Sequence, residues 1–436
     1  MKARAATRAL RPEHRLTLLK GGEALFPALV EAIAGARAEV LLETYIFAFA
    51  RAALPVAQAL ADAAARGVTV RVVVDGVGTG DVPAEWQQRW QAAGVHWIVF
   101  NPARGWRLLV PKHWRRLHRK LCVVDGQTGF CGGINLLDDY FDPNHGTLAQ
   151  PRFDFAVRVA GPLVADMHGT MTRLWARLEV TREAQHLDVA AAFQAVLAAA
   201  HAGTDMQDAR MQAGLDPDDE DEDNGDGDGD SDSDSGVSTP PANGALAALV
   251  LRDNLRFRRS IEGSYRIAIA LAKSEILIAN AYFIPGVQLQ RALLRAAQRG
   301  VRITLLLQGR YEYFMQYHAS RAVYGVMLGA GIQIIEYEAS FLHAKVAVMD
   351  AAGGRLAIVG SSNLDPLSLL LAREANVVVR DDAFAAELRA HLLDAIAKGR
   401  RVAPDAHVRW PVIVRGRNWL AYALMRVLLY VSGKRY

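Results

Sequence analysis

The 436-residue chain repeats one long sequence pattern, and this internal repeat constrains the fold more than any other feature. Four segments of the first part recur in the same order in the second part. The matches are ARAEVLLETYIF with AKSEILIANAYFI, AAARGVTVRVVVDG with AAQRGVRITLLLQG, AAGVHWIVF with GAGIQIIEY, and HRKLCVVDGQTGFCGGINL with HAKVAVMDAAGGRLAIVGSSNL. Four ordered matches indicate two halves that share one fold.

Each half alternates short β-branched runs with stretches rich in Ala and Leu. Residues 68–74 and 302–307 have the strand pattern, and residues 56–65 and 287–298 have the helix pattern. This alternation predicts an α/β fold in which each half is a mostly parallel sheet flanked by helices. The apolar runs are continuous, so we expect strands covered on both faces. Two such fused halves would pack side by side, with one active site at their interface.

An acidic segment separates the two halves. Residues 216–234 hold twelve Asp or Glu and no Lys or Arg, and without those charges the formal charge of the chain rises from +4 to +16. We expect a disordered linker at 203–243, because a segment with many like charges and little to bury does not form a core. The expected domains are then a first half at 1–202, this linker, a second half at 244–402 and a basic C-terminal segment at 403–436.

The basic remainder favours a partner with many negative charges, either nucleic acid or an anionic membrane surface. Solubility alone is the alternative explanation. The GDGDGD stretch of the linker has carboxylates suited to calcium, but it lacks the Glu of an EF-hand and the framework of a β-helix repeat. Cys122 and Cys131 form no zinc or disulfide pattern, and we interpret both as buried strand residues. We expect no metal and no cofactor.

The last of the four matches carries the motif HxKxxxxD in both halves. Its residues are His118, Lys120 and Asp125 in the first half, and His343, Lys345 and Asp350 in the second. Side chains two residues apart on a strand share a face, so each histidine should project together with its lysine. The aspartates fall at strand ends, where we expect a structural role or a contact with a lysine. A Gly-rich segment and an asparagine, Asn135 or Asn363, follow each copy.

Two imidazoles and two ammonium groups suit the transfer of a phosphoryl group. The transition state of phosphodiester cleavage spreads negative charge over the non-bridging oxygens. One imidazole can attack phosphorus, while the other protonates the leaving oxygen and then serves as a base. The lysines would supply the positive charge that a divalent metal often provides elsewhere. A single HxK pair would be weak support, whereas two copies at equivalent places of a repeat favour catalysis.

These motifs resemble the phospholipase D superfamily, whose pattern is HxKxxxxD followed by GGxN or GSxN. The resemblance to the bacterial cardiolipin synthases of that superfamily runs from about residue 16 to residue 380, apart from the acidic linker. It implies a phosphatidyl-enzyme mechanism with His118 as the nucleophile and His343 as the acid and base, although the sequence alone does not rank the two. It also implies a carboxylate behind each histidine, at Asp154 and Glu374.

One position departs from the superfamily pattern. Where the second half usually reads SxxxNxE, this chain has Ser368, then Ala372 in place of the asparagine, and then Glu374. We therefore expect a hydrogen bond to be missing near the second histidine.

Two stretches outside the motifs favour a lipid substrate. Residues 104–120 place Trp106 and Trp114 among seven Lys or Arg, a composition typical of membrane interfaces, although bases can also stack on indoles. The apolar segment 419–432 is too short to span a bilayer and contains Arg426, so it predicts an interfacial helix. A core helix with basic flanks would have the same pattern. No secretory signal is seen at the N-terminus.

The resemblance implies a cardiolipin synthase that transfers a phosphatidyl group from one phosphatidylglycerol to another and releases glycerol. A phospholipase D hydrolase, or a phosphatidyltransferase with another donor or alcohol, is the alternative, and an inactive lipid- or nucleic-acid-binding protein is a third possibility. We expect phospholipid substrates, an anionic membrane surface as partner, no nucleic acid, and a peripheral location on the cytoplasmic side of the cell inner membrane. The sequence does not predict the oligomeric state.

Overall fold

The computed structural model describes residues 10–102, 114–185, 244–253, 257, 259–351, 353–365, 372–405 and 410–431. The chain forms two compact units, one made of 1–168 together with 245–436 and the other of 169–244. The predicted linker at 203–243, with its GDGDGD stretch, lies outside the described residues, as do Trp106 and Ser368. Both copies of the repeat belong to the first unit, which is described below.

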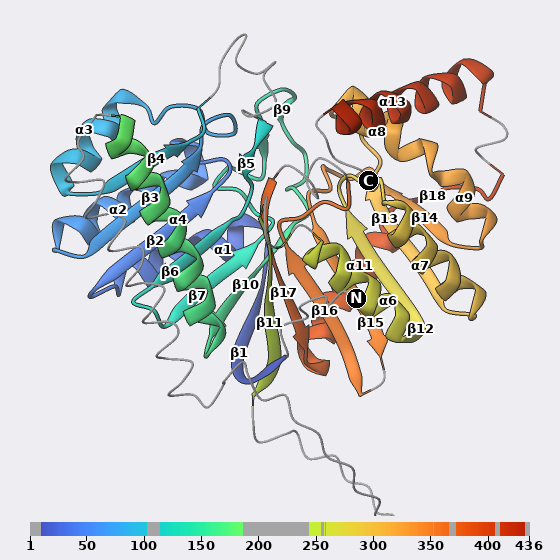
Figure 1. Cartoon of the computed structure of the whole chain (residues 1–436), viewed down its shortest axis with the longest axis horizontal. Coiled ribbons are helices and arrows are strands. Elements are labelled where there is room, and N and C mark those ends of the chain that lie inside the picture. Colours follow the sequence, from blue (N-terminus) through green and yellow to red (C-terminus); the bar gives the residue numbers. More distant parts are fainter. Residues whose placement is uncertain are drawn as a thin grey trace, which may run out of the picture. The chain divides into compact units, whose positions relative to one another are not determined.

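The two copies of the repeat form the same succession of strands and helices (Figure 1). The first copy contains β1 (Arg11–Lys20), α1 (Gly21–Ala34), β2 (Glu39–Thr44), α2 (Leu54–Ala65), β3 (Thr69–Asp75), α3 (Ala84–Ala93), β4 (His96–Phe100), β5 (Arg116–Leu117), β6 (Leu121–Val124), β7 (Thr128–Gly132), β10 (Phe155–Ala160) and the start of α4 (Leu163–Gln185). A small hairpin, β8 (Phe141–Asp142) with β9 (Gly146–Thr147), precedes β10.

The second copy follows the same plan and adds a C-terminal helix. It contains β11 (Ala245–Arg252), α6 (Ser260–Leu271), β12 (Ala272–Asn280), α7 (Val287–Gln298), β13 (Arg302–Gln308), α8 (Phe314–Ala322), α9 (Tyr324–Gly329), β14 (Gln333–Tyr337), β15 (Lys345–Ala351), β16 (Gly354–Gly360), β17 (Ala372–Arg380), α11 (Asp382–Lys398), β18 (Arg400–Arg401) and α13 (Val412–Val431). The strands predicted at 68–74 and 302–307 and the helices predicted at 56–65 and 287–298 are confirmed as β3, β13, α2 and α7.

Within the described residues, sixteen strands form one mixed sheet, in the order β18-β14-β13-β12-β15-β16-β17-β11-β1-β10-β7-β6-β2-β3-β4, with β5 beside β17. The prediction of an α/β fold is confirmed, but the prediction of mostly parallel sheets is wrong. Strands run parallel in β2-β3-β4, in β12-β13-β14 and between β5 and β17, and the other pairs are antiparallel. The difference arises because tight hairpins, which allow only antiparallel pairing, join β6 to β7 and β15 to β16.

The hairpin between β6 and β7 shows how local sequence sets this direction. Asp125 and Gly126 have φ values of 51° and 64°, the left-handed backbone of a two-residue turn that suits an Asp-Gly pair. Cys122 and Cys131 lie on the two strands of this hairpin and are buried and unpaired, as the sequence predicts.

The two halves join where β1 pairs antiparallel with β11, in the middle of the sheet (Figure 1). Each half keeps its own hydrophobic core. Val70, Val72 and Val74 of β3 are fully buried in the first core, and Ile303, Leu305 and Leu307 of β13 are buried at the equivalent places of the second. Neighbouring residues on both strands are also buried, so the strands are covered on both faces as predicted.

The C-terminal helix α13 packs on α8 through one narrow face. Ala421 and Met425 are buried against Ala319 of α8 and Ile284. Six other large apolar side chains of α13 are exposed, namely Val412, Ile413, Trp419, Leu420, Leu424 and Val427. None of the helices in the described ranges has the length and apolar character that a bilayer crossing requires.

Candidate active site

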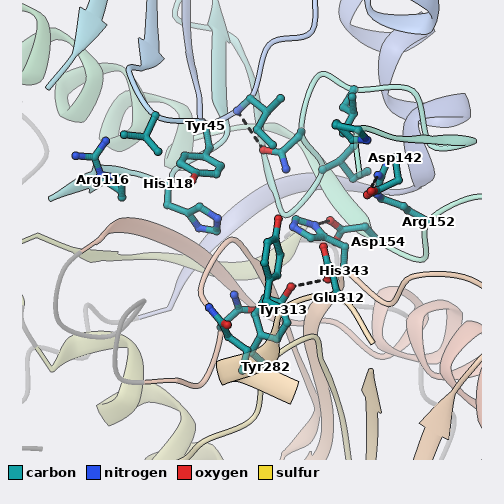
Figure 2. Close-up of a pocket in the computed structure, with 18 of the residues that line it drawn as sticks. Tyr45, Arg116, His118, Asp142, Arg152, Asp154, Tyr282, Glu312, Tyr313 and His343 are labelled. Carbon is teal, nitrogen blue, oxygen red and sulfur yellow. Dashed lines mark hydrogen bonds and ion pairs between the residues drawn. The ribbon is translucent and has the colours of Figure 1, made fainter. Parts of the chain in front are cut away.

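The two motif histidines, one from each half, meet in a single cavity. His118 lies between β5 and β6, and His343 lies just before β15. Both rings line a cavity of about 610 Å³ whose walls come from both halves. Their side chains keep 14% and 22% of their surface exposed, so both rings are accessible from the cavity. Figure 2 shows the two rings in the middle of this cavity.

Each histidine is held by the other half of the chain. The Nδ1 atom of His118 lies 3.0 Å from a carboxylate oxygen of Glu374 on β17, and Nδ1 of His343 lies 2.6 Å from Asp154, just before β10. Backbone hydrogen bonds also connect each histidine to the other half of the chain. The N–H of His118 donates to the carbonyl of Arg373, and the N–H of His343 donates to the carbonyl of Phe153. With Nδ1–H donated to a carboxylate, Nε2 keeps its lone pair for a phosphorus atom.

Burial sets the protonation of these pairs. It lowers the pKa of His118 and of His343 well below the usual range for imidazole, and the nearby lysine charges act in the same direction. Burial also raises the pKa of Asp154 to about 7 and that of Glu374 to about 8, while Lys345 and Lys120 oppose the rise. With their pKa values lowered in this way the imidazoles are neutral near pH 7, which is the form that can act as a nucleophile.

The two motif lysines lie beneath the histidines rather than on the cavity surface. Lys345 is fully buried and Lys120 is 7% exposed. The ammonium of Lys120 donates to the carbonyl of His118 at 2.9 Å, and that of Lys345 donates to the carbonyl of His343. Burial lowers the pKa of Lys120 to about 7 and that of Lys345 to about 8. Their charge is thus fixed close to both rings and is sensitive to pH near neutrality.

The motif aspartates lie away from the cavity, at the far ends of their strands. Asp125 accepts hydrogen bonds from the backbone N–H groups of residues 37, 38 and 39, at 2.8 to 2.9 Å. Asp350 accepts from the backbone of Ser274 and Glu275 and from the Ser274 hydroxyl. Of the two roles that the sequence left open, these contacts correspond to the structural one, because each aspartate ties the motif strand to the start of its neighbour.

The glycine-rich segments bring Asn135 and Asn363 into the cavity wall. Gly133 lies so close to the carboxylate of Asp154 that an added Cβ would stand 2.3 Å from Oδ1. The equivalent position in the second half is Ser361, whose hydroxyl donates to Glu374. Each segment therefore positions the carboxylate that supports a histidine, one by leaving space and the other by donating a hydrogen bond.

Sequence reasoning missed several residues of the cavity wall. They are Tyr45, Arg116, Asp142, Arg152, Tyr282, Glu312 and Tyr313 (Figure 2). Arg116 is paired with Asp75 at 3.1 Å, and Arg152 with Asp142 at 2.6 Å. Tyr45, Tyr282 and Glu312 follow the C-terminal ends of parallel strands, which is the edge at which α/β sheets bind ligands. Their position after predicted strands is the sequence feature that could have identified them as cavity residues.

The departure at Ala372 lies on a different side of the site from the one expected. Ala372 lines the cavity, pairs with Arg116 across β17 and β5, and stands two residues before Glu374. Because Glu374 supports His118, the altered neighbourhood belongs to the first histidine, and the expectation that it lies near the second is wrong. Of the basic stretch 104–120 with its two tryptophans, the structure describes residues 114–120, and Trp114 also lines the cavity.

A shared cavity that takes one motif histidine from each of two α/β halves, with the motif lysine buried behind each, places this protein in the class of phospholipase D-like enzymes. Residues 29–150 and 265–395 match the family described as "Cardiolipin synthase, PLD-like domain". The chain therefore belongs to this family of phospholipase D-like phosphatidyltransferases.

Individual relatives agree with this assignment. Cardiolipin synthase B of Salmonella typhi is 33% identical over 392 residues, which cover 88% of this chain and 80% of that protein. Cardiolipin synthase B of Escherichia coli is 33% identical over 387 residues, with 89% and 81% covered. Among solved structures, the phosphatidylserine synthase of Haemophilus influenzae is similar with a TM-score of 0.61 over 98% of both chains, at 11% identity. That last likeness shows the shared fold.

Proposed function

We propose that this enzyme transfers a phosphatidyl group from one phosphatidylglycerol to a hydroxyl of a second, producing cardiolipin and glycerol. The observation that carries the proposal is the pair of histidines in one cavity, each with Nδ1 held by a carboxylate of the opposite half. The similarity to cardiolipin synthase B proteins supports the choice of substrates.

In the first step, Nε2 of His118 attacks phosphorus and forms a P–N bond. The P–O bond to the headgroup glycerol breaks, and the leaving oxygen takes a proton from Nε2 of His343. Burial lowers the pKa of His343, but a phosphodiester anion between the rings raises it again, so the proton enters the site together with the substrate. Asp154 stabilises the imidazolium form.

In the second step, the hydroxyl of another phosphatidylglycerol gives its proton to Nε2 of His343. Its oxygen bonds to phosphorus while the P–N bond to His118 breaks, which restores the neutral imidazole of His118 and the imidazolium of His343 with which the cycle began. Lys120 and Lys345 stabilise the negative charge on the non-bridging oxygens in both steps, a role that needs no metal ion. The assignment of His118 as nucleophile follows the resemblance to the superfamily.

We further propose that α13 binds an anionic membrane surface and holds the enzyme peripherally on the cytoplasmic side of the inner membrane. Its exposed apolar residues include Trp419 at 68% and Leu420 at 64%. Arg415, Arg417 and Arg426 are exposed on the same helix and suit acidic headgroups. The alternative interpretation, a core helix, describes only one narrow face of α13, the face that contains the buried residues Ala421 and Met425.

Product analysis tests the proposed reaction. Purified protein is incubated with vesicles that contain labelled phosphatidylglycerol, and the lipids are separated by thin-layer chromatography. Cardiolipin with an equal amount of glycerol is expected, and His118→Ala should abolish both. If phosphatidic acid dominates and cardiolipin is absent, the enzyme is a hydrolase. If no lipid is converted and a nucleic acid is cleaved, the choice of a lipid substrate is wrong.

A further inference from the structure

The cavity contains an acidic side chain, Glu312, that the phosphoryl chemistry does not use. Glu312 lies in the loop between β13 and α8, at the C-terminal end of a parallel strand. It lines the cavity together with both histidines. Figure 2 places it on the His343 side, beside Tyr282 and Tyr313. It has no part in holding either imidazole, since Asp154 and Glu374 perform that task.

Tyr282 fixes one oxygen of this carboxylate. The hydroxyl of Tyr282 donates a hydrogen bond to Oε2 of Glu312. Burial holds the pKa of Tyr282 well above its usual range, so the phenol remains a donor. In the part of the chain that the structure describes, Oε1 receives no hydrogen bond. Oε1 is thus a fixed acceptor in the wall of a cavity that must admit an alcohol.

The surrounding charges indicate which alcohol suits this acceptor. Burial raises the pKa of Glu312, and the nearby charge of Asp142 raises it further, while the hydrogen bond from Tyr282 and the charges of Lys345 and Arg152 lower it. A carboxylate repels phosphate but accepts hydrogen bonds from hydroxyl groups.

We propose that Glu312, positioned by Tyr282, binds the hydroxyl groups of the acceptor alcohol on the His343 side of the cavity and so selects a polyol headgroup over water. The proposal rests on the transfer reaction above and adds a residue to it. Glu312 forms and breaks no covalent bond. The attacking hydroxyl gives its proton to His343, while the neighbouring hydroxyl of the same glycerol donates to Glu312.

A donor whose leaving group lacks a polyol separates this role from the histidine chemistry. We would use phosphatidyl-p-nitrophenol, because p-nitrophenol release reports formation of the phosphatidyl-enzyme without any glycerol in the site. Glycerol or 1-propanol is then added, and the ratio of the phosphatidyl alcohol to phosphatidic acid is measured. The variants are Glu312→Gln, Glu312→Asp and Tyr282→Phe. Glu338→Gln is the matched control, since Glu338 pairs with Arg400 outside the cavity.

For Glu312→Gln we expect p-nitrophenol release within about threefold of the wild type and a glycerol ratio lowered by about tenfold or more, the effect of losing a charged hydrogen-bond acceptor. The 1-propanol ratio should change by less than about twofold, because that alcohol has no second hydroxyl to bind. Tyr282→Phe should lower the glycerol ratio less, and Glu312→Asp should retain part of it. Glu338→Gln should behave as the wild type.

Three results would overturn the proposal: an unchanged glycerol ratio in Glu312→Gln, an equal fall with 1-propanol, or a parallel fall in p-nitrophenol release. If the wild-type enzyme releases no p-nitrophenol, the proposed reaction itself has failed. Wild-type transfer to glycerol with no response to Glu312→Gln would remove only the acceptor role.

Discussion

The crossed support of the histidines leads to a prediction that separates their two roles. Glu374→Gln replaces the carboxylate behind His118, and Asp154→Asn replaces the one behind His343, each with an amide of similar size. A hydrogen bond to a charged group contributes about 1.5–3 kcal/mol and a neutral one about 0.5–1.5 kcal/mol, so each variant should lose the difference, about 1.3 kcal/mol of transition-state stabilisation. That loss corresponds to a rate reduction of about tenfold in the step that uses the affected imidazole.

Rapid-mixing kinetics with phosphatidyl-p-nitrophenol reveal which step has slowed. The p-nitrophenolate ion leaves without a proton, so the burst of its release depends on the nucleophile and not on the acid. Glu374→Gln should slow the burst by about tenfold, whereas Asp154→Asn should leave the burst unchanged and slow only steady-state cardiolipin formation. Unfolding temperatures serve as the control for folding, because removing a buried charge can stabilise a protein.

The opposite pattern, with a slow burst in Asp154→Asn and a normal burst in Glu374→Gln, would make His343 the nucleophile. If neither variant altered any rate, the hydrogen bonds to Nδ1 would have no catalytic effect and the mechanism would be refuted.

The other predictions concern pH, packing, the motif aspartate and the membrane helix. The pKa of Lys120 lies at about 7 and that of Lys345 at about 8, so both side chains are charged below those values and lose their charge as pH rises through them. KM for phosphatidylglycerol should therefore rise from pH 7 to pH 9, by at most about tenfold per pH unit for each proton. A KM that does not change over this range would contradict the prediction. In a denaturant titration, Gly133→Ala should lower the free energy of unfolding by about 1–3 kcal/mol, because the added Cβ clashes with Asp154. In the same titration Gly263→Ala should leave the free energy of unfolding unchanged or raise it, because a Cβ there meets nothing within 4 Å. Asp125→Asn should lower stability by about 1–2 kcal/mol with little change in kcat, and a large loss of kcat in a stable variant would instead place Asp125 in the chemistry. The double variant Trp419→Ser with Leu420→Ser should weaken co-sedimentation with phosphatidylglycerol vesicles by at least about tenfold. The control variant Leu271→Ser, at an exposed leucine of α6, should bind the vesicles as the wild type does. Equal binding by the double variant and the control would refute the role of α13.

The repeat allowed the fold class, the strands around the motifs and the histidine–lysine pairs to be predicted, because these depend on local pattern. Strand direction was not predicted correctly, since a run such as that of β6 looks the same in a parallel or an antiparallel pair. The choice depends on the short turn at Asp125 and Gly126, because a turn of that length can join only antiparallel neighbours.

The sequence alone could not predict which carboxylate supports which histidine. His118 and Glu374 are 256 residues apart, and His343 and Asp154 are 189 apart. These contacts depend on the pairing of β1 with β11, for which no local pattern exists. Glu312 was missed for a related reason, since it is one residue in a loop outside the four matched segments. Its significance appears only when the loop is seen beside His343.

The exchange of carboxylates between the halves also bears on how the protein is made. Translation proceeds from the N-terminus, so His118 and Lys120 leave the ribosome long before Glu374 exists. Until the second half has folded, the imidazole of His118 has no carboxylate to orient it and no partner to supply a proton. We therefore expect a chain that ends before Glu374 to lack phosphoryl-transfer activity, because the cavity is complete only after β11 has joined β1.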